Sequence, residues 1–180
     1  MRIVIATPLY PPDIALPAPY VKELARRLAY THDVTVVAYG RYPEAIPGVR
    51  ILVASKRYPL PIRLVAFFQL LLRAAKDADA LIIENGPSVE LPASVLALLT
   101  PIRLVMHVGD RDAHERARVS EMLGRIERFA QDRAHAVISD LPEPAPEILP
   151  FDEPSLGSFK GYEASWEAHL ARIETALAHG

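Results

Sequence analysis

The chain contains no cysteine, which excludes disulfide bonds, thiolate catalysis and metal sites built from cysteine. It also has no large excess of charge of one sign. The 20 basic and 22 acidic side chains give a formal net charge of −2, so composition offers no electrostatic reason to expect a nucleic-acid partner. No apolar run is long enough to span a bilayer, and the apolar start is too short for a signal peptide. We therefore expect a cytoplasmic protein without a transmembrane segment.

Hydrophobic residues, by contrast, are abundant. They make up 51% of the 180 residues, enough for one domain with a sizeable core. Short apolar runs alternate with stretches of helical periodicity, which predicts an α/β fold with a single Rossmann-like, doubly wound parallel sheet in the strand order 3-2-1-4-5-6. We expect strands at 2–6, 32–38, 48–54, 78–83, 102–107 and 134–139, and helices at 20–29, 60–76, 87–99 and 112–132.

Two of these helices carry specific expectations. The helix over 60–76 has an apolar stripe flanked by Arg63, Arg73 and Lys76. We interpret the stripe as core, with peripheral contact to an anionic membrane as the alternative. Asp112 and Glu115 form a capping-box pattern for the helix over 112–132. The two expected buried stripes are Leu60, Leu64, Phe67, Phe68, Leu71, Leu72 and Ala75, and Met122, Leu123, Ile126, Phe129 and Ala130.

Residues 141–160 interrupt the alternation. Five prolines fall between residues 141 and 154, and proline disrupts both helices and sheet ladders, so we expect an extended connector there. After it, residues 162–178 predict a helix with Trp166, Leu170, Ile173 and Leu177 on one face, packed back on the sheet. The chain thus divides into a domain (1–140), a connector (141–160) and a closing helix (161–180).

Two sequence features carry a resemblance to a known family. They are the run from Thr7 to Asp13, with its Pro11-Pro12 pair, and the closing Ser165-Trp166-Glu167. Together they resemble family-4 glycosyltransferases of the GT-B fold. Residues 1–140 are similar to the N-terminal, acceptor-side domain, and the last helix is similar to the one that ends such enzymes. The resemblance implies half of a GT-B fold, because these 180 residues hold no counterpart of the donor-binding domain or its two glutamates spaced eight apart.

The proline loop departs from the family pattern. Ala15 and Leu16 stand where the family has glycines, which let the backbone approach the donor diphosphate. A side chain removes that access, so the resemblance implies that donor binding is lost; the alternative is a loop that still binds a donor. The same loop places Pro12 and Asp13 at the carboxyl end of the first strand, where α/β sheets bind ligands.

His107 matches a family histidine near the acceptor hydroxyl, and such a histidine orients or polarises a substrate hydroxyl. The alternative is a vestigial histidine bonded to its neighbours. Glu84, Asn85 and Gly86 follow the fourth strand and either bind an acceptor hydroxyl or form a turn.

His107, Asp110, Asp112 and His114 lie close together in the sequence and form a candidate metal-binding group. Imidazole and carboxylate are suitable ligands, but this spacing matches no known ligand pattern. We therefore interpret Asp110 as a residue of the cleft loops and expect neither a metal nor a cofactor.

The leading hypothesis is a glycosyltransferase-like half-domain that is inactive alone and binds a glycan-type acceptor or a partner glycosyltransferase chain. One alternative is an active enzyme assembled as a homodimer or with a donor-domain subunit. Another is a non-enzymatic interaction module. We also expect a second copy or another chain to cover an exposed apolar patch at the cleft. Its expected members are Leu9, Tyr10, Ile14, Leu16 and Pro17.

Overall fold

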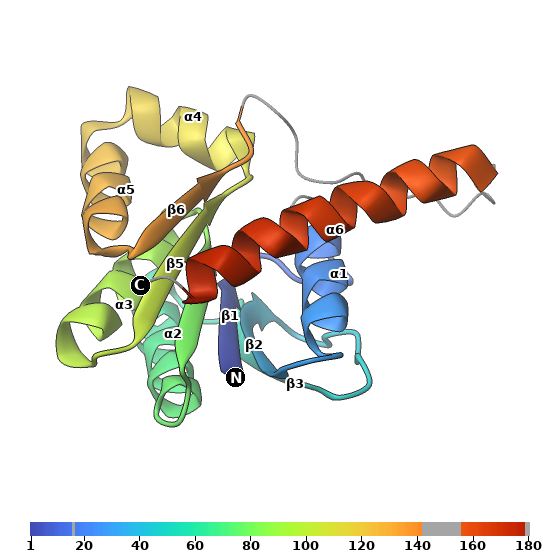
Figure 1. Ribbon diagram of the computed structural model, residues 1–180. Coiled ribbons are helices and arrows are strands. Elements are labelled where there is room, and N and C mark those ends of the chain that lie inside the picture. Colours follow the sequence, from blue (N-terminus) through green and yellow to red (C-terminus); the bar gives the residue numbers. More distant parts are fainter. Residues whose placement is uncertain (16, 142–155, 179–180) are drawn as a thin grey trace.

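The computed structural model describes residues 1–15, 17–141 and 156–178 (Figure 1). They contain a six-stranded sheet in the order β3-β2-β1-β4-β5-β6, and every neighbouring pair is parallel. The predicted fold class and strand order are thereby confirmed. The strands are β1 (Arg2–Thr7), β2 (Asp33–Gly40), β3 (Val49–Ser55), β4 (Ala80–Glu84), β5 (Arg103–Val108) and β6 (Ala136–Ser139).

Helices cover both faces of the sheet (Figure 1). Alternate strand residues separate the two core layers: Ile3 and Ile5 pack with α1 and α6, whereas Val4 and Ala6 pack with α2 and α3. The central strands are therefore buried on both sides, which explains why they are continuous apolar runs. The helices are α1 (Ala18–Leu28), α2 (Leu60–Ala75), α3 (Pro87–Leu99), α4 (Arg111–Val119), α5 (Glu121–Arg133) and α6 (Leu156–Ala178).

The single helix expected over 112–132 is wrong, because Ser120 divides it into α4 and α5. The Ser120 hydroxyl accepts a hydrogen bond from the Leu123 amide and so caps α5. The capping box from Asp112 is also wrong. Asp110 caps α4 instead, with its carboxylate 3.0 Å from the Ala113 nitrogen. Met122, in the first turn of α5, is 68% exposed rather than buried.

The predicted stripe of α2 is buried only in part. Phe67, Leu71 and Ala75 pack in the core, but Leu60 and Leu72 are exposed. The sheet and α3 cover one side of α2, and nothing in the described chain covers the other. The stripe is wider than the surface available to bury it.

The closing helix packs on the sheet as predicted, on the face that also carries α1 (Figure 1). Trp166 and Leu177 are 0% exposed. The Arg27 guanidinium of α1 donates two hydrogen bonds, of 2.7 and 2.9 Å, to the Glu163 carboxylate of α6. The helix begins at Leu156, whereas the expected connector extended to residue 160. Residues 142–155 lie outside the described part. None of the described helices has the length and apolarity needed to cross a membrane.

Candidate functional site

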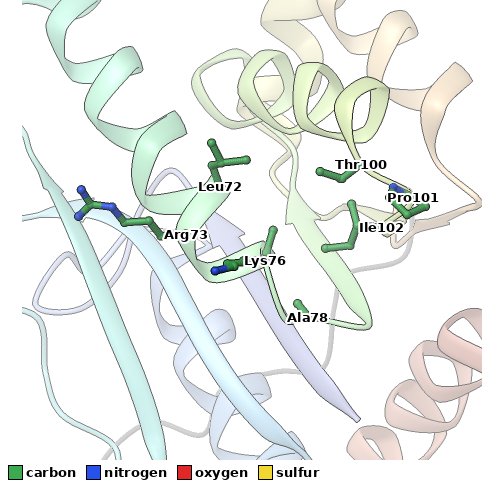
Figure 2. A pocket seen from close by; sticks show the side chains of 8 residues that line it. Leu72, Arg73, Lys76, Ala78, Thr100, Pro101 and Ile102 are labelled. Carbon is green, nitrogen blue, oxygen red and sulfur yellow. The ribbon is translucent and has the colours of Figure 1, made fainter.

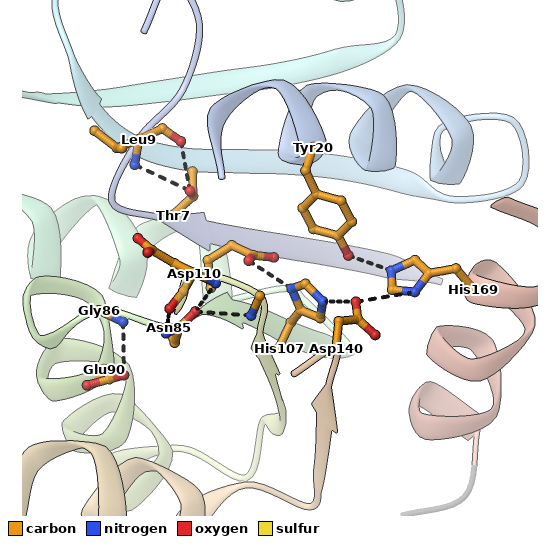
Figure 3. Close-up of polar contacts among 12 residues, drawn as sticks. Thr7, Leu9, Tyr20, Asn85, Gly86, Glu90, His107, Asp110, Asp140 and His169 are labelled. Atoms are coloured by element: carbon orange, nitrogen blue, oxygen red, sulfur yellow. Dashed lines mark hydrogen bonds and ion pairs between the residues drawn. The ribbon is translucent and has the colours of Figure 1, made fainter. Parts of the chain in front are cut away.

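Polar side chains gather at the carboxyl edge of the sheet (Figure 3). Thr7 ends β1, Glu84 ends β4, His107 lies at the end of β5, and Asp140 follows β6. All four side chains are buried. Ligands bind at this edge in open α/β sheets, so the carboxyl edge is where a functional site is expected.

His107 is held between two carboxylates. Its Nδ1 lies 2.8 Å from a Glu84 oxygen, and its Nε2 lies 2.7 Å from an Asp140 oxygen. The side chain is 1% exposed. A neutral imidazole has one donor and one acceptor, whereas the charged form donates from both nitrogens. The arrangement therefore selects the imidazolium, which donates to both carboxylates.

The charge balance around His107 points the same way. Burial alone lowers the pKa of this histidine, but the charge of Glu84 and the hydrogen bonds to both carboxylates outweigh burial and raise the pKa to about 9. A carboxylate near a histidine favours the protonated ring, and here two carboxylates act together. His107 is therefore a cation at neutral pH.

Aromatic rings from two helices pack in a stack on one face of the His107 ring. The Tyr20 ring of α1 stacks on His107, with centroids 4.7 Å apart, and Trp166 of α6 stacks on Tyr20 at 5.7 Å. The Tyr20 hydroxyl lies 2.7 Å from Nε2 of His169. Burial lowers the pKa of His169 to about 4, against the opposing charge of Asp140, so His169 is neutral. We assign its Nε2 as the acceptor of the tyrosine proton.

Asp140 joins this cluster to α6. Its second oxygen accepts a hydrogen bond of 2.9 Å from Arg172, which lies on that helix. Burial favours the neutral carboxyl group, but the hydrogen bonds from His107 and Arg172 prevail and hold the pKa of Asp140 below its usual range. The Asp140 carboxylate thus connects His107 of β5 with Arg172 of α6.

The loops after β4 and β5 are joined through Asn85. Its side-chain amide donates to the Asp110 carbonyl at 2.8 Å, and its oxygen accepts from the amides of Gly109 and Asp110. Gly86 has a φ of +148°, a conformation that side chains rarely adopt, and its amide donates to the Glu90 carboxylate. These contacts account for Asn85 and Gly86 as turn-forming residues.

The proline loop after β1 borders an open cleft of about 330 Å³. Pro12 and Asp13 line it, and Asp13 pairs with Lys56, the two charged atoms lying 2.6 Å apart. Tyr10 is fixed beneath the loop by a hydrogen bond of 3.2 Å from its hydroxyl to the Glu44 carbonyl. The remaining lining residues are Tyr10, Pro11, Tyr39, Gly40, Arg41, Tyr42, Pro43, Val53 and Lys56.

A larger depression, of about 520 Å³, lies at the opposite edge of the sheet (Figure 2). It is lined by residues that end α2 or lead into β4 and β5, among them Leu72, Ala78 and Ile102. The Thr100 hydroxyl there is already bonded to the Leu96 carbonyl. The cleft beside the proline loop, by contrast, lies at the carboxyl edge of the sheet, where ligands bind in such folds, and it combines charged, aromatic and loop residues. We therefore regard this cleft as the candidate binding site.

Comparison with protein-family models gives a match to the glycosyl transferase 4-like domain over residues 17–145, more than two thirds of the chain. The chain belongs to this family. The comparison with curated proteins found no match.

Within this glycosyltransferase 4-like domain, the predicted site residues separate into two groups. His107 and Glu84 are bonded to each other in the buried cluster, with Asn85 and Asp110 in the adjoining loops. Pro12 and Asp13 line the cleft. Ala15 is exposed beside the loop, and its carbonyl accepts from the Ala18 amide. Leu16 lies outside the described residues.

The apolar patch expected on this domain is wrong in its composition. Tyr10 is 2% exposed because it packs in the core with α1, and Pro17 is buried where α1 begins. Ile14, by contrast, is 92% exposed. Among the expected members that the structure describes, Ile14 is the only strongly exposed side chain.

A different set of potential metal ligands comes together in this domain, formed by His107, Asp140 and His169. One ligand atom from each lies within 4.8 Å of the others. Two of these side chains already have other partners: both ring nitrogens of His107 contact carboxylates, and Asp140 pairs with Arg172. A metal ion at these three residues would displace the His107 contact to Asp140.

Sequence reasoning missed Tyr20, Asp140, His169 and Arg172. Asp140 directly follows the last strand, in the way that His107 ends β5, so the same strand-end rule could have found it. His169 lies one helical turn after Trp166, on the buried face of α6. No local signal links Tyr20, His169 and Arg172 to this cluster, because their contacts arise only when α1 and α6 pack on the sheet.

Proposed function

We propose that this glycosyltransferase 4-like domain is an acceptor-side module, which binds a glycan-type ligand in the cleft beside the proline loop and transfers no sugar without a donor-binding partner. The observation that carries the proposal is the state of His107. The residue that matches the family's acceptor-side histidine has both ring nitrogens bonded to carboxylates.

In this state both ring nitrogens of His107 are occupied, so neither is free to bind a substrate hydroxyl. A general base or a positioning histidine needs a ring nitrogen within hydrogen-bond reach of the substrate hydroxyl. Here the ring is 1% exposed and already protonated, and Tyr20 covers one of its faces. It can neither take a proton from a hydroxyl nor reach one without breaking two charged hydrogen bonds. A structural role for His107 supports an inactive isolated chain.

The proline loop supports the same conclusion. Ala15 occupies a position where the related enzymes have a glycine for the donor diphosphate. A side chain at this position hinders the close approach of the backbone to a phosphate that glycine allows. A partner chain that brings its own phosphate-binding groups could complete the donor side at this exposed edge. A second copy of this chain is one such partner, and a separate donor-domain subunit is another.

A turnover assay tests the proposal. The purified chain is incubated with a panel of nucleotide sugars, alone and with a separately expressed donor-type domain, and hydrolysis and transfer are measured. We expect no turnover by the chain alone. Turnover by the chain alone that disappears in His107→Ala would contradict the proposal and establish a self-sufficient transferase. His135→Ala, outside the carboxyl edge, is the matched histidine control.

Peripheral membrane contact is a second candidate function, favoured by the exposed start of α2. Leu60, Ile62 and Val65 are 53%, 55% and 57% exposed, and Arg57 and Arg63 flank them. Apolar side chains with neighbouring cations suit an anionic bilayer surface. We expect co-sedimentation with phosphatidylglycerol-containing vesicles, reduced by Val65→Asp and unchanged by Val119→Asp on α4. Equal behaviour of the two variants, or no wild-type binding, would contradict this function.

A further inference from the structure

Two cationic side chains and one acidic side chain line the cleft beside the proline loop, and the nearby Glu44 is paired with Lys22. The two lining cations are Arg41 and Lys56, and the Arg63 guanidinium carbon lies 5.6 Å from the ring centroid of Tyr39, another lining residue. Asp13 is the acidic side chain in the lining. This local excess of cations stands out in a chain whose formal net charge is −2.

Two of these cations have no acidic partner in the described chain. Lys56 is paired with Asp13, but Arg41 is exposed and forms no ion pair with a described residue. Arg63 likewise pairs with no described carboxylate, and its buried Nε has no hydrogen-bond partner there. Arginine suits phosphate and carboxylate groups, because its planar donors match their oxygens. An anionic group in the cleft would find charge that the protein itself has not neutralised.

The rest of the cleft suits a small polyol ring. Its volume of about 330 Å³ lies at the low end for small-molecule sites, which favours one ring over a long glycan. Tyr42 is 80% exposed at the rim and presents an apolar ring face with a polar tip. The neighbouring Tyr39 is fixed by stacking on Phe67, with centroids 4.3 Å apart, so that wall of the cleft is preformed.

We infer that the cleft binds a single sugar-type ring carrying a compact anion, a phosphate or a carboxylate, with Arg41 as its principal cation. The inference rests on the proposed acceptor role and names the ligand class for that site. Tyr42 contacts the ring, and Arg41 binds the anion.

Asp13 has a separate part in this arrangement. Its carboxylate lies 2.6 Å from the Lys56 ammonium and competes with a ligand anion for that cation. The pair is partly exposed, with side-chain exposures of 36% for Lys56 and 41% for Asp13, so a ligand can separate it. Removing the Asp13 charge should therefore tighten anion binding, whereas an Asp13 that binds a sugar hydroxyl would weaken binding when it is replaced.

The test is an amide NMR titration of the full chain with glucose, glucose 6-phosphate, glucuronate and inorganic phosphate. We expect both anionic sugars to shift the amides of Gly40, Arg41 and Tyr42 and to bind more tightly than either glucose or phosphate. Loss of one charge-assisted contact in Arg41→Gln should weaken glucose 6-phosphate roughly tenfold. Asp13→Asn should tighten it. Arg73→Gln, at the opposite edge of the sheet, is the matched control and should leave binding unchanged.

Four results would overturn the inference. Equal affinity for glucose and glucose 6-phosphate would remove the anion requirement while leaving the acceptor role intact. Equal affinity for phosphate and glucose 6-phosphate would reduce the cleft to a bare anion site. Anionic binding that Arg41→Gln does not alter, or no binding by any probe, would remove the assigned site. The turnover assay judges the proposed function separately, and unchanged thermal unfolding of each variant shows that the fold is retained.

Discussion

The phenol ring of Tyr20 lies almost flat against the imidazole ring of His107, with centroids 4.7 Å and ring planes 20° apart. The same phenol stacks on Trp166 and bonds through its hydroxyl to His169. Tyr20 therefore joins strand β5 to the closing helix α6 through one buried cluster. The histidine that invites a catalytic interpretation is also the residue on which the helix depends.

Removal of the sole tryptophan tests how far the fold depends on α6. Trp166 is fully buried and stacks on Tyr20. Trp166→Ala should lower the free energy of unfolding by roughly 3–5 kcal/mol, the range for large aromatic truncations in cores. Urea denaturation followed by circular dichroism measures the loss. Leu99→Ala, exposed at the end of α3, is the control, and a native tryptophan emission maximum typical of water would contradict the assignment.

The His107 cation should make stability depend on alkaline pH. Its folded-state pKa is raised from 6.5 to about 9, since the two carboxylates outweigh burial. The resulting stabilisation is fully present below pH 6.5 and is lost as pH rises to 9. The wild type should therefore lose on the order of 3 kcal/mol relative to His107→Gln across that interval.

Denaturation of both proteins at pH 6 and pH 9.5 measures this difference. The Glu90 carboxyl, whose pKa burial raises to about 7, titrates in both proteins and cancels in the comparison. A constant difference between wild type and variant across the interval would show that His107 is not a buried cation.

Gly109 should not tolerate a side chain. A Cβ there would lie 2.5 Å from Cε1 of His107, too close for any contact between carbon atoms. Because two hydrogen bonds and a stacked ring hold His107, the clash cannot be relieved cheaply. Gly109→Ala should cost about 1–3 kcal/mol, as overpacking does in cores.

The matched control is Gly161→Ala, at an exposed position of α6 where an added Cβ meets nothing within 4 Å. It should stabilise the protein by up to about 1 kcal/mol, because alanine has a higher helix propensity than glycine. Thermal unfolding of both variants measures the contrast. Equal effects at the two glycines would contradict the tight packing around His107.

The fold was largely predictable from sequence because the strands are buried on both faces. Runs such as Ile3–Ala6 and Leu81–Ile83 have no polar residue, which is typical of parallel strands between helix layers. The exposure of Leu60 was not predictable, since a half-covered helix and a fully covered one have the same apolar spacing. The break at Ser120 was missed because helical periodicity continues across it.

The candidate site was predictable only where it follows strand ends. Asp13 was found in the loop after β1, and Glu84 and His107 were found at the carboxyl ends of β4 and β5. The pairing of His107 with Asp140 comes from the neighbouring strands β5 and β6, whereas the approach of His169 and Arg172 depends on where α6 docks. The apolar spacing of α6 predicts that the helix packs on the sheet but not which polar side chains it brings to His107, so the protonation state of His107 could not be derived from the sequence alone.

The most direct test of the central claim is nitrogen-15 NMR of the His107 imidazole at pH 7.5, assigned by comparison with His107→Gln. An acceptor-side module with a structural His107 predicts two protonated ring nitrogens, bonded to Glu84 and Asp140, and a titration midpoint near pH 9. A neutral ring with one unprotonated nitrogen, titrating near pH 6.5, would contradict the account, because that histidine would be available to act on a substrate hydroxyl.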